Sequence, residues 1–281
     1  MIRLLVLTLA VLLGLPTAAA AADLPAAGAF LARSLDGEGC AREAGGRASV
    51  SLTAWVTLGL VATGRDSSRA AGCIVAHAQE LRVITDVELA ILALVAAGRP
   101  PVRGGVLPMA LDRAVRGGRI GPTIASTQFG LLALRALGRP VPAAVRAQVE
   151  HDQSSDGSWA VGPGGDGDSN LTASGIEALI AAGVRPSSRA VGRGVRALQL
   201  FRAGGGFALG RAGEPDAQST AWALQGLAAV GQTDGRAVAY LTRLQGRDGA
   251  FSYSAGQRIT PVWVTAQAVL GLARRPFPLR P

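Results

Sequence analysis

A helical segment that recurs six times constrains the fold of this chain more than any other feature of its sequence. Each copy has a polar start with an early Thr or Ser, an apolar stretch rich in Ala and Leu, and usually a terminal Gly. Apolar residues at spacings of three and four are typical of helices, and a glycine in the left-handed conformation ends a helix at little steric cost. The copies occupy residues 49–64, 85–98, 123–138, 169–183, 217–231 and 260–275.

More polar segments that carry arginine lie between these copies and have one solvated face. We expect helices here over residues 25–35, 67–81, 106–115, 142–153, 188–201 and 235–245. The apolar copies suit an inner position and the arginine-bearing segments an outer one, which predicts six helical hairpins. Stacked hairpins can form an open solenoid or a closed ring, and closure would bury the apolar last copy.

The first 22 residues have the pattern of a secretory signal peptide. Arg3 precedes an apolar run from Leu4 to Leu15, and small residues follow as far as Ala22. This run is shorter than the ~20 residues that a membrane-spanning helix needs. We therefore expect residues 1–22 to be removed and the mature chain to be secreted, extracellular or in the cell envelope, without a transmembrane anchor. Its length alone allows one large domain or two small ones.

The two cysteines and the charge restrict the partners of the chain. Cys40 and Cys73 could form a disulfide after export, and two separate buried thiols are the alternative. The net charge is +9, but every basic residue is an arginine and these are spread along the chain. Because no basic cluster is interleaved with aromatic residues, we do not expect nucleic acid to bind. We expect a monomer that meets an unknown small molecule or an envelope protein.

Short turn motifs follow several of the outer segments. Residues 153–159 are QSSDGSW and residues 244–251 are LQGRDGAF, with a looser LQLFRAGGGF at 198–207. These resemble the QxxxGxW (QW) repeats of the squalene cyclase, oxidosqualene (terpene) cyclase and protein prenyltransferase superfamily. The resemblance implies an all-α fold, an (α/α)6 toroid of six helical hairpins, with residues 23–281 as a single domain. It also implies structural roles in QW-type turns for Gln153, Gly157, Trp159, Gln245, Gly249 and Phe251.

The acid motif of the terpene cyclases is incomplete here. Class II members of that family protonate an olefin with the middle acid of a DxDD motif. Asp216 occupies the first position in PDAQSTAWAL, but Gln218 and Ser219 replace the proton donor and its neighbour. An amide and a hydroxyl are not acidic enough for this step. A second candidate, GDGDSNLTA, fails because Asn170 and Leu171 precede its threonine.

The sequence predicts no metal site and no cofactor. The prenyltransferases hold zinc with Asp, Cys and His, but His77 and His151 lie on outer helices without a paired ligand at a metal spacing. Asp166, Asp168, Asn170 and Glu177 have a spacing similar to that of a calcium loop, but Leu171 replaces the required glycine. We expect this polar loop to cap the fourth inner helix through Ser169 or Asn170 instead.

The sequence therefore favours binding over catalysis. Aromatic residues make up 4% of the chain, and few lie on the inner segments. The last 23 residues, which contain ITPVWVTAQAVLGLARRPFPL, also resemble the end of the α-domain of transcobalamin and intrinsic factor, secreted toroids that bind a corrinoid. Our leading hypothesis is a noncatalytic binding or scaffold protein of the cell envelope, for a small apolar or corrinoid-like ligand or a protein partner.

The alternative hypothesis is a terpene cyclase/mutase-type enzyme that acts on a polyprenyl substrate. The candidate ligand contacts are polar groups near the starts of the inner helices and the inner aromatic residues. For each of them, helix capping or core packing is the competing interpretation. They are Trp55, Asp86, Gln128, Asn170, Asp216, Gln218, Trp222, Trp263 and Gln267.

Overall fold

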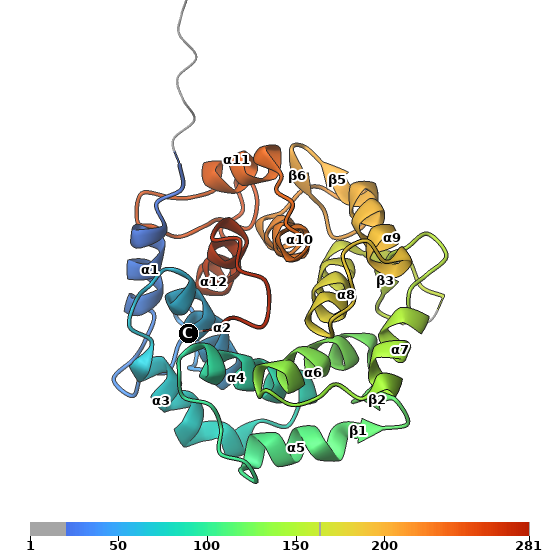
Figure 1. The fold of residues 1–281 in the computed structure, drawn as a ribbon. Coiled ribbons are helices and arrows are strands. Elements are labelled where there is room, and N and C mark those ends of the chain that lie inside the picture. The colour runs from blue at the N-terminus through green and yellow to red at the C-terminus, as the bar shows by residue number, and fades with distance from the viewer. Residues whose placement is uncertain (1–20, 163, 281) are drawn as a thin grey trace, which may run out of the picture.

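The computed structural model describes residues 21–162 and 164–280, and in these residues α-helices form two concentric rings (Figure 1). The inner ring consists of α2 (Val50–Ala62), α4 (Ile84–Ala96), α6 (Ile124–Ala136), α8 (Ser169–Ala181), α10 (Ala217–Ala229) and α12 (Pro261–Leu272). The outer ring consists of α1 (Leu24–Arg33), α3 (Ser68–His77), α5 (Val106–Ala114), α7 (Ala143–His151), α9 (Arg189–Leu198) and α11 (Gly235–Arg243). The predicted all-α toroid of six hairpins is confirmed. The expected signal peptide falls almost entirely on residues 1–20, which lie outside the described residues.

The ends of the inner helices follow from local chemistry. The side chains of Ser49, Thr123, Asp168 and Asp216 each accept a backbone N–H bond from the first turn of the helix that they precede. Five inner helices end before a glycine with a φ between +68° and +85°. The expected cap of α8 was wrong, because Asp168 caps this helix while Ser169 and Asn170 lie in its first turn.

Short hairpins occur in the links from outer to inner helices, and the sequence did not predict them. They pair β1 (Val115–Arg116) with β2 (Arg119–Ile120), β3 (Trp159–Ala160) with β4 (Gly167–Asp168), and β5 (Arg202–Ala203) with β6 (Gly206–Phe207). Two short 3-10 helices, η1 (Ala78–Glu80) and η2 (Gln199–Phe201), extend outer helices. Strands of two residues are too short to form a sheet core, so the helical packing alone determines the architecture.

The glutamine of a QW-type turn joins one hairpin to the next. The amide of Gln153 donates to the carbonyl oxygens of Gly157 and of Ala190 in α9, both at 2.9 Å. The indole N–H of Trp159 donates to the carbonyl oxygen of Val149 at 2.8 Å, so this buried ring has its polar atom satisfied. These bonds connect the end of α7, and the turn that follows it, to the start of α9.

The last hairpin closes onto the first, which makes a ring rather than an open solenoid. The Gln245 amide accepts from the backbone N–H of Asp23 and donates to its carbonyl oxygen, both at 2.7 Å. The Glu43 carboxylate accepts the N–H groups of Val262 and Trp263 at the start of α12, at 3.1 and 2.9 Å. Helix α12 packs against both α1 and α2 (Figure 1).

A disulfide joins the segment between α1 and α2 to the outer helix α3. The sulfur atoms of Cys40 and Cys73 are bonded, and the two Cα atoms lie 5.3 Å apart. Of the two alternatives left open by the sequence, the structure contains the disulfide. Within the described residues, none of the helices has the length and apolarity to cross a bilayer.

Candidate functional site

A repeated threonine fixes the height of the inner helices against the outer turns. Its hydroxyl accepts a backbone N–H bond from the link before the helix, at 2.8 to 3.4 Å. The residues are Thr53, Thr127, Thr172, Thr220 and Thr265, and Val87 has the equivalent place in α4. Residues at the same distance along the chain from this position therefore lie at equivalent levels of the ring. We call the interior enclosed by the six inner helices the lumen.

Three aromatic residues meet in the lumen two positions after the threonine. Trp55, Phe129 and Trp222 come from α2, α6 and α10, which are not neighbours in the ring. The ring centroids of Trp55 and Trp222 are 5.9 Å apart, and those of Phe129 and Trp222 are 5.7 Å apart. Side chains of non-neighbouring helices can meet in this way only across the centre. We call these three residues the aromatic layer.

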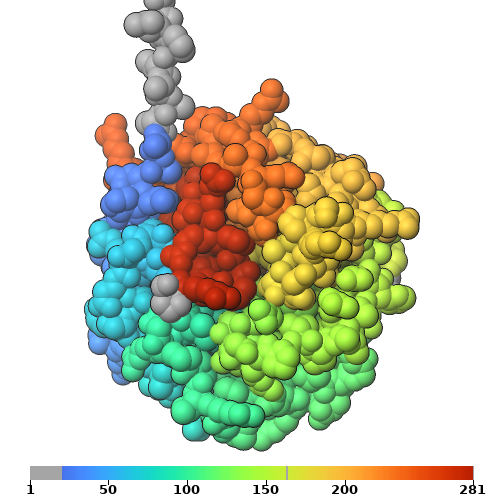
Figure 2. Space-filling view, viewed as in Figure 1, coloured from blue at the N-terminus to red at the C-terminus, as the bar shows by residue number. Residues whose placement is uncertain are grey.

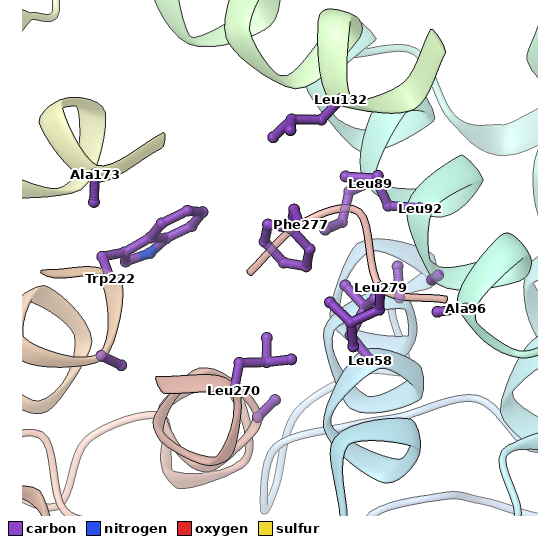
Figure 3. Close-up of a cluster of buried hydrophobic side chains, with 14 of the residues drawn as sticks. Leu58, Leu89, Leu92, Ala96, Leu132, Ala173, Trp222, Leu270, Phe277 and Leu279 are labelled. Carbon is purple, nitrogen blue, oxygen red and sulfur yellow. The ribbon is translucent and has the colours of Figure 1, made fainter. Parts of the chain in front are cut away.

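The C-terminal segment, residues 274–280, turns into the lumen after α12. The ring of Phe277 lies 5.9 to 6.4 Å from each ring of the aromatic layer, and Phe277 is 4% exposed. Leu279 is also buried and lies among Leu58, Leu92 and Ala96 (Figure 3). We call this segment the tail. It fills the lumen on the side where the inner helices end.

Leucines form most of the next level, five positions after the threonine. They are Leu58, Leu92, Leu132 and Leu270, all buried. The same position is Glu177 in α8 and Gln225 in α10, two helices that pack against each other. The Glu177 carboxylate accepts the backbone N–H of Phe277 at 2.6 Å, and the Gln225 amide donates to the carbonyl oxygen of Arg275 at 3.2 Å. Both polar side chains therefore bind the backbone of the tail.

Burial raises the pKa of two carboxyl groups of the inner ring. Desolvation raises the pKa of Glu177 to about 8, although the N–H bond from Phe277 acts in the opposite direction. Burial also raises the pKa of Glu88 well above its usual range, and neither of its side-chain oxygens has a hydrogen-bond partner. Glu88 lies against Gly130, between α4 and α6, whereas Glu177 faces the tail. At neutral pH the lumen therefore carries a neutral carboxyl group at Glu177.

Some of the candidate contacts come together in the lumen. Trp55 and Trp222 belong to the aromatic layer, and Gln267 occupies the equivalent position in α12. Gln267 is 1% exposed, and both polar atoms of its amide lack a hydrogen-bond partner. Gln128 directly precedes Phe129 in α6, and its side-chain oxygen accepts a hydrogen bond from the hydroxyl of Ser174. Trp55 and Trp222 therefore make one site with Phe277 of the tail, whereas Gln128 lies between α6 and α8, against Ser174 and Gly175.

The remaining candidates lie at the starts of the inner helices. Asp216 caps α10 by accepting the backbone N–H of Ser219 at 2.7 Å, and burial raises its pKa. The Asp216 carboxylate is therefore a helix cap, the interpretation that competes with a ligand contact. Asp86, Asn170, Gln218 and Trp263 lie in the first turns of α4, α8, α10 and α12 and are half-buried. These residues lie at the beginnings of the inner helices.

One cluster in the part of the chain that the structure describes has three potential metal ligands: Cys40, Cys73 and His77. The two sulfur atoms are bonded to each other, so neither is free as a thiolate ligand. The spacing similar to a calcium loop does not form a site either. Asp166 is exposed in its loop, whereas Glu177 is buried in α8 and bound to the tail.

Glu177, Gln225, Phe277 and Leu279 were not among the candidates. An alignment of the six copies on their threonines could have found the first two, since they interrupt a column of leucines. No comparable signal marks Phe277 and Leu279, because the motif PFPL is typical of a surface loop. The inner helices carry few aromatic residues, but three of them lie around one point.

Comparisons with known proteins give structural relatives only: no family model and no curated protein sequence matches the chain. A type II terpene cyclase from Scytonema, solved with its substrate geranylgeranyl dihydroxybenzoate, has a TM-score of 0.66 and 16% identity. The match covers 89% of this chain and 95% of that one. An ent-copalyl diphosphate synthase from Streptomyces platensis has a TM-score of 0.58 and 20% identity, over 80% of this chain and 50% of that one.

A glycosidase in complex with glucose is also similar, with a TM-score of 0.59 and 16% identity over 89% of this chain and 95% of that one. Proteins with different reactions therefore share this architecture, so the likeness establishes the fold and not a reaction. The chain has the α/α toroid fold of these terpene cyclase structures.

Proposed function

We propose that the lumen receives a polyprenyl-type chain, which the protein binds as a ligand or substrate. One observation carries this proposal: three aromatic rings from non-neighbouring helices surround an apolar side chain at the centre of the toroid. The leucine level above them extends the apolar wall. The structural relatives include cyclases of isoprenoid compounds, which favours the polyprenyl alternative over the scaffold hypothesis.

The lining of the lumen suits a long apolar chain with one polar end. Burial of apolar surface contributes roughly 25 cal/mol per Å², so a polyprenyl chain gains affinity along its whole length. A small number of well-placed polar groups then fixes the orientation of a ligand. The unpartnered amide of Gln267 is such a group. The tail places two apolar side chains, Phe277 and Leu279, along the lumen, as an apolar chain would.

Cyclisation is a second candidate activity, and Glu177 is the observation that favours it. This residue places a protonated carboxyl group in the lumen, close to the aromatic layer through its contact with Phe277. Aromatic faces stabilise cations, as a cyclisation requires. A carboxyl group with a pKa of about 8 is, however, a weak acid, and protonation of an olefin needs a strong one. Binding without turnover is therefore the first expectation.

A titration of the full chain with geranylgeraniol, followed by tryptophan fluorescence, tests the proposal, because two of the four tryptophans, Trp55 and Trp222, lie in the lumen. We expect saturable binding, and Phe129→Leu should weaken it about 3- to 10-fold because an aromatic contact is worth roughly 0.5 to 1.5 kcal/mol. The matched control is Phe30→Leu, a half-buried phenylalanine of the outer helix α1, which should change affinity less than about twofold. Equal weakening by both substitutions would place the ligand outside the lumen.

The same samples decide between ligand and substrate. After incubation, gas chromatography with mass spectrometry would detect cyclic isomers of the added alcohol. Unchanged geranylgeraniol supports a binding protein, whereas an isomer that is absent with Glu177→Gln supports cyclisation through that carboxyl group.

We also propose that the mature protein acts outside the cytoplasm. The pattern of residues 1–22 supports export, and the disulfide between Cys40 and Cys73 is of the kind that persists in oxidising compartments.

A further inference from the structure

The tail covers the middle of the face on which the inner helices end. In the space-filling view the red C-terminal residues fill the centre of this face between the teal and yellow segments (Figure 2). Phe277 and Leu279 are both buried, and each points into the lumen (Figure 3). The lumen is therefore occupied by part of the same chain.

The last inner helix is built differently from the other five. The others continue nine residues past the threonine position and end before a glycine, whereas α12 ends at Leu272, seven residues after Thr265. Arg274 then takes a left-handed conformation, with φ at +52°. Because α12 ends earlier, the chain turns into the lumen at a level where the other inner helices are still in their last turn.

Polar side chains of the inner ring hold the tail by its backbone. Glu177 and Gln225 replace leucine at two adjacent places, and each bonds one tail residue. Arg275 donates to the carbonyl oxygens of Val61 at the end of α2 and of Arg280 in the tail, at 3.3 and 2.7 Å. A cation at the C-terminal end of a helix is favoured by the helix dipole. The tail is thus bound by matched groups on α2, α8 and α10.

The contacts of the tail are also those that an apolar ligand would use. Phe277 completes the aromatic layer with Trp55, Phe129 and Trp222, and Leu279 continues along the leucines. The opposite side of the aromatic layer is less covered, since Trp55 and Phe129 are only half-buried. The tail has no regular secondary structure, so its release would not require a helix or strand of the ring to unfold.

We propose that residues 274–280 are an intramolecular plug, which occupies the ligand site of the lumen and must leave before a ligand binds there. Glu177 and Gln225 are positioning residues that hold the plug. The identity of the ligand rests on the proposed function above, but the plug itself does not depend on that identity. A peptide with the sequence of the plug can therefore test it.

The test compares the full chain with a chain that ends at Arg274. The apolar dye N-phenyl-1-naphthylamine should bind the shortened chain at least tenfold more tightly, and a synthetic peptide of residues 275–280 should displace the dye. A control peptide with Phe277 and Leu279 both replaced by serine should not displace it. Equal dye affinity of the two chains, or displacement by both peptides, would overturn the plug.

A full-length variant guards against misfolding of the shortened chain. Glu177→Leu with Gln225→Leu completes the leucine level and removes both bonds to the tail, so it should stay folded by circular dichroism. We expect this variant to bind the dye at least threefold more tightly than the natural chain. A folded variant with unchanged dye affinity would show that these two side chains do not hold the plug.

Geranylgeraniol separates this proposal from the proposed function. Displacement of the dye by the peptide but not by geranylgeraniol would support the plug and contradict the polyprenyl ligand. Equal binding of geranylgeraniol to the full and the shortened chain would support the ligand and contradict the plug.

Discussion

Glu177→Gln is expected to remove much of the loss of stability that the protein shows as the pH rises from 5 to 9. Burial raises the pKa of Glu177 from 4.5 to about 8, so the folded state retains a proton that the unfolded state releases. The stabilisation by this proton is complete below pH 4.5 and is lost as the pH rises through 8. One pKa unit corresponds to about 1.4 kcal/mol, so the loss is on the order of several kcal/mol.

Urea unfolding at pH 5 and at pH 9 measures this effect. The glutamine variant should match the natural protein at pH 5, since its carbonyl oxygen can still accept the N–H of Phe277, and should be the more stable of the two at pH 9. Glu150→Gln, at an exposed position of α7, is the matched control and should leave the pH profile unchanged. Glu88→Gln should remove a separate part of the dependence, because burial raises that pKa as well. The same slope in Glu177→Gln as in the natural protein would contradict the buried neutral carboxyl.

Removing the disulfide with Cys40→Ala and Cys73→Ala should lower the free energy of unfolding by about 3 to 4 kcal/mol. The two cysteines are 33 residues apart, and a crosslink of that span restricts the unfolded chain by roughly this amount. Urea unfolding with and without a reductant provides the measurement. The natural protein should lose stability in the reductant, whereas the double variant should not respond. A natural protein that is insensitive to reductant and carries two reactive thiols would contradict the crosslink.

Much of the fold could be predicted from the sequence because its signals are local. The spacing of apolar residues indicated the inner helices, and the glycines marked five of their ends. Ring closure could not be predicted in this way, since stacking of hairpins is compatible with an open solenoid. The contacts of Gln245 with Asp23 decide it, and they join residues 222 positions apart. Only the resemblance to toroid proteins indicated closure in advance.

The site was harder to predict because its residues depend on how the six copies align. Polar residues at helix starts drew attention, but Asp216 and Asp168 are caps that satisfy their own helices. Glu177 is polar in the middle of a helix, and its role follows only from the leucines at the same level of the ring. The position of Phe277 results from long-range packing, so no local pattern reveals that the tail is buried.

Hydrogen exchange at the backbone N–H of Phe277 tests most directly whether the lumen is a ligand site filled by the tail. In the free protein this amide is bonded to Glu177 and should be protected. Saturating geranylgeraniol should accelerate its exchange at least tenfold, while the amides of α8 and α10 remain protected. Bound geranylgeraniol with an equally protected Phe277 amide would contradict the account, since ligand and tail would then occupy different places.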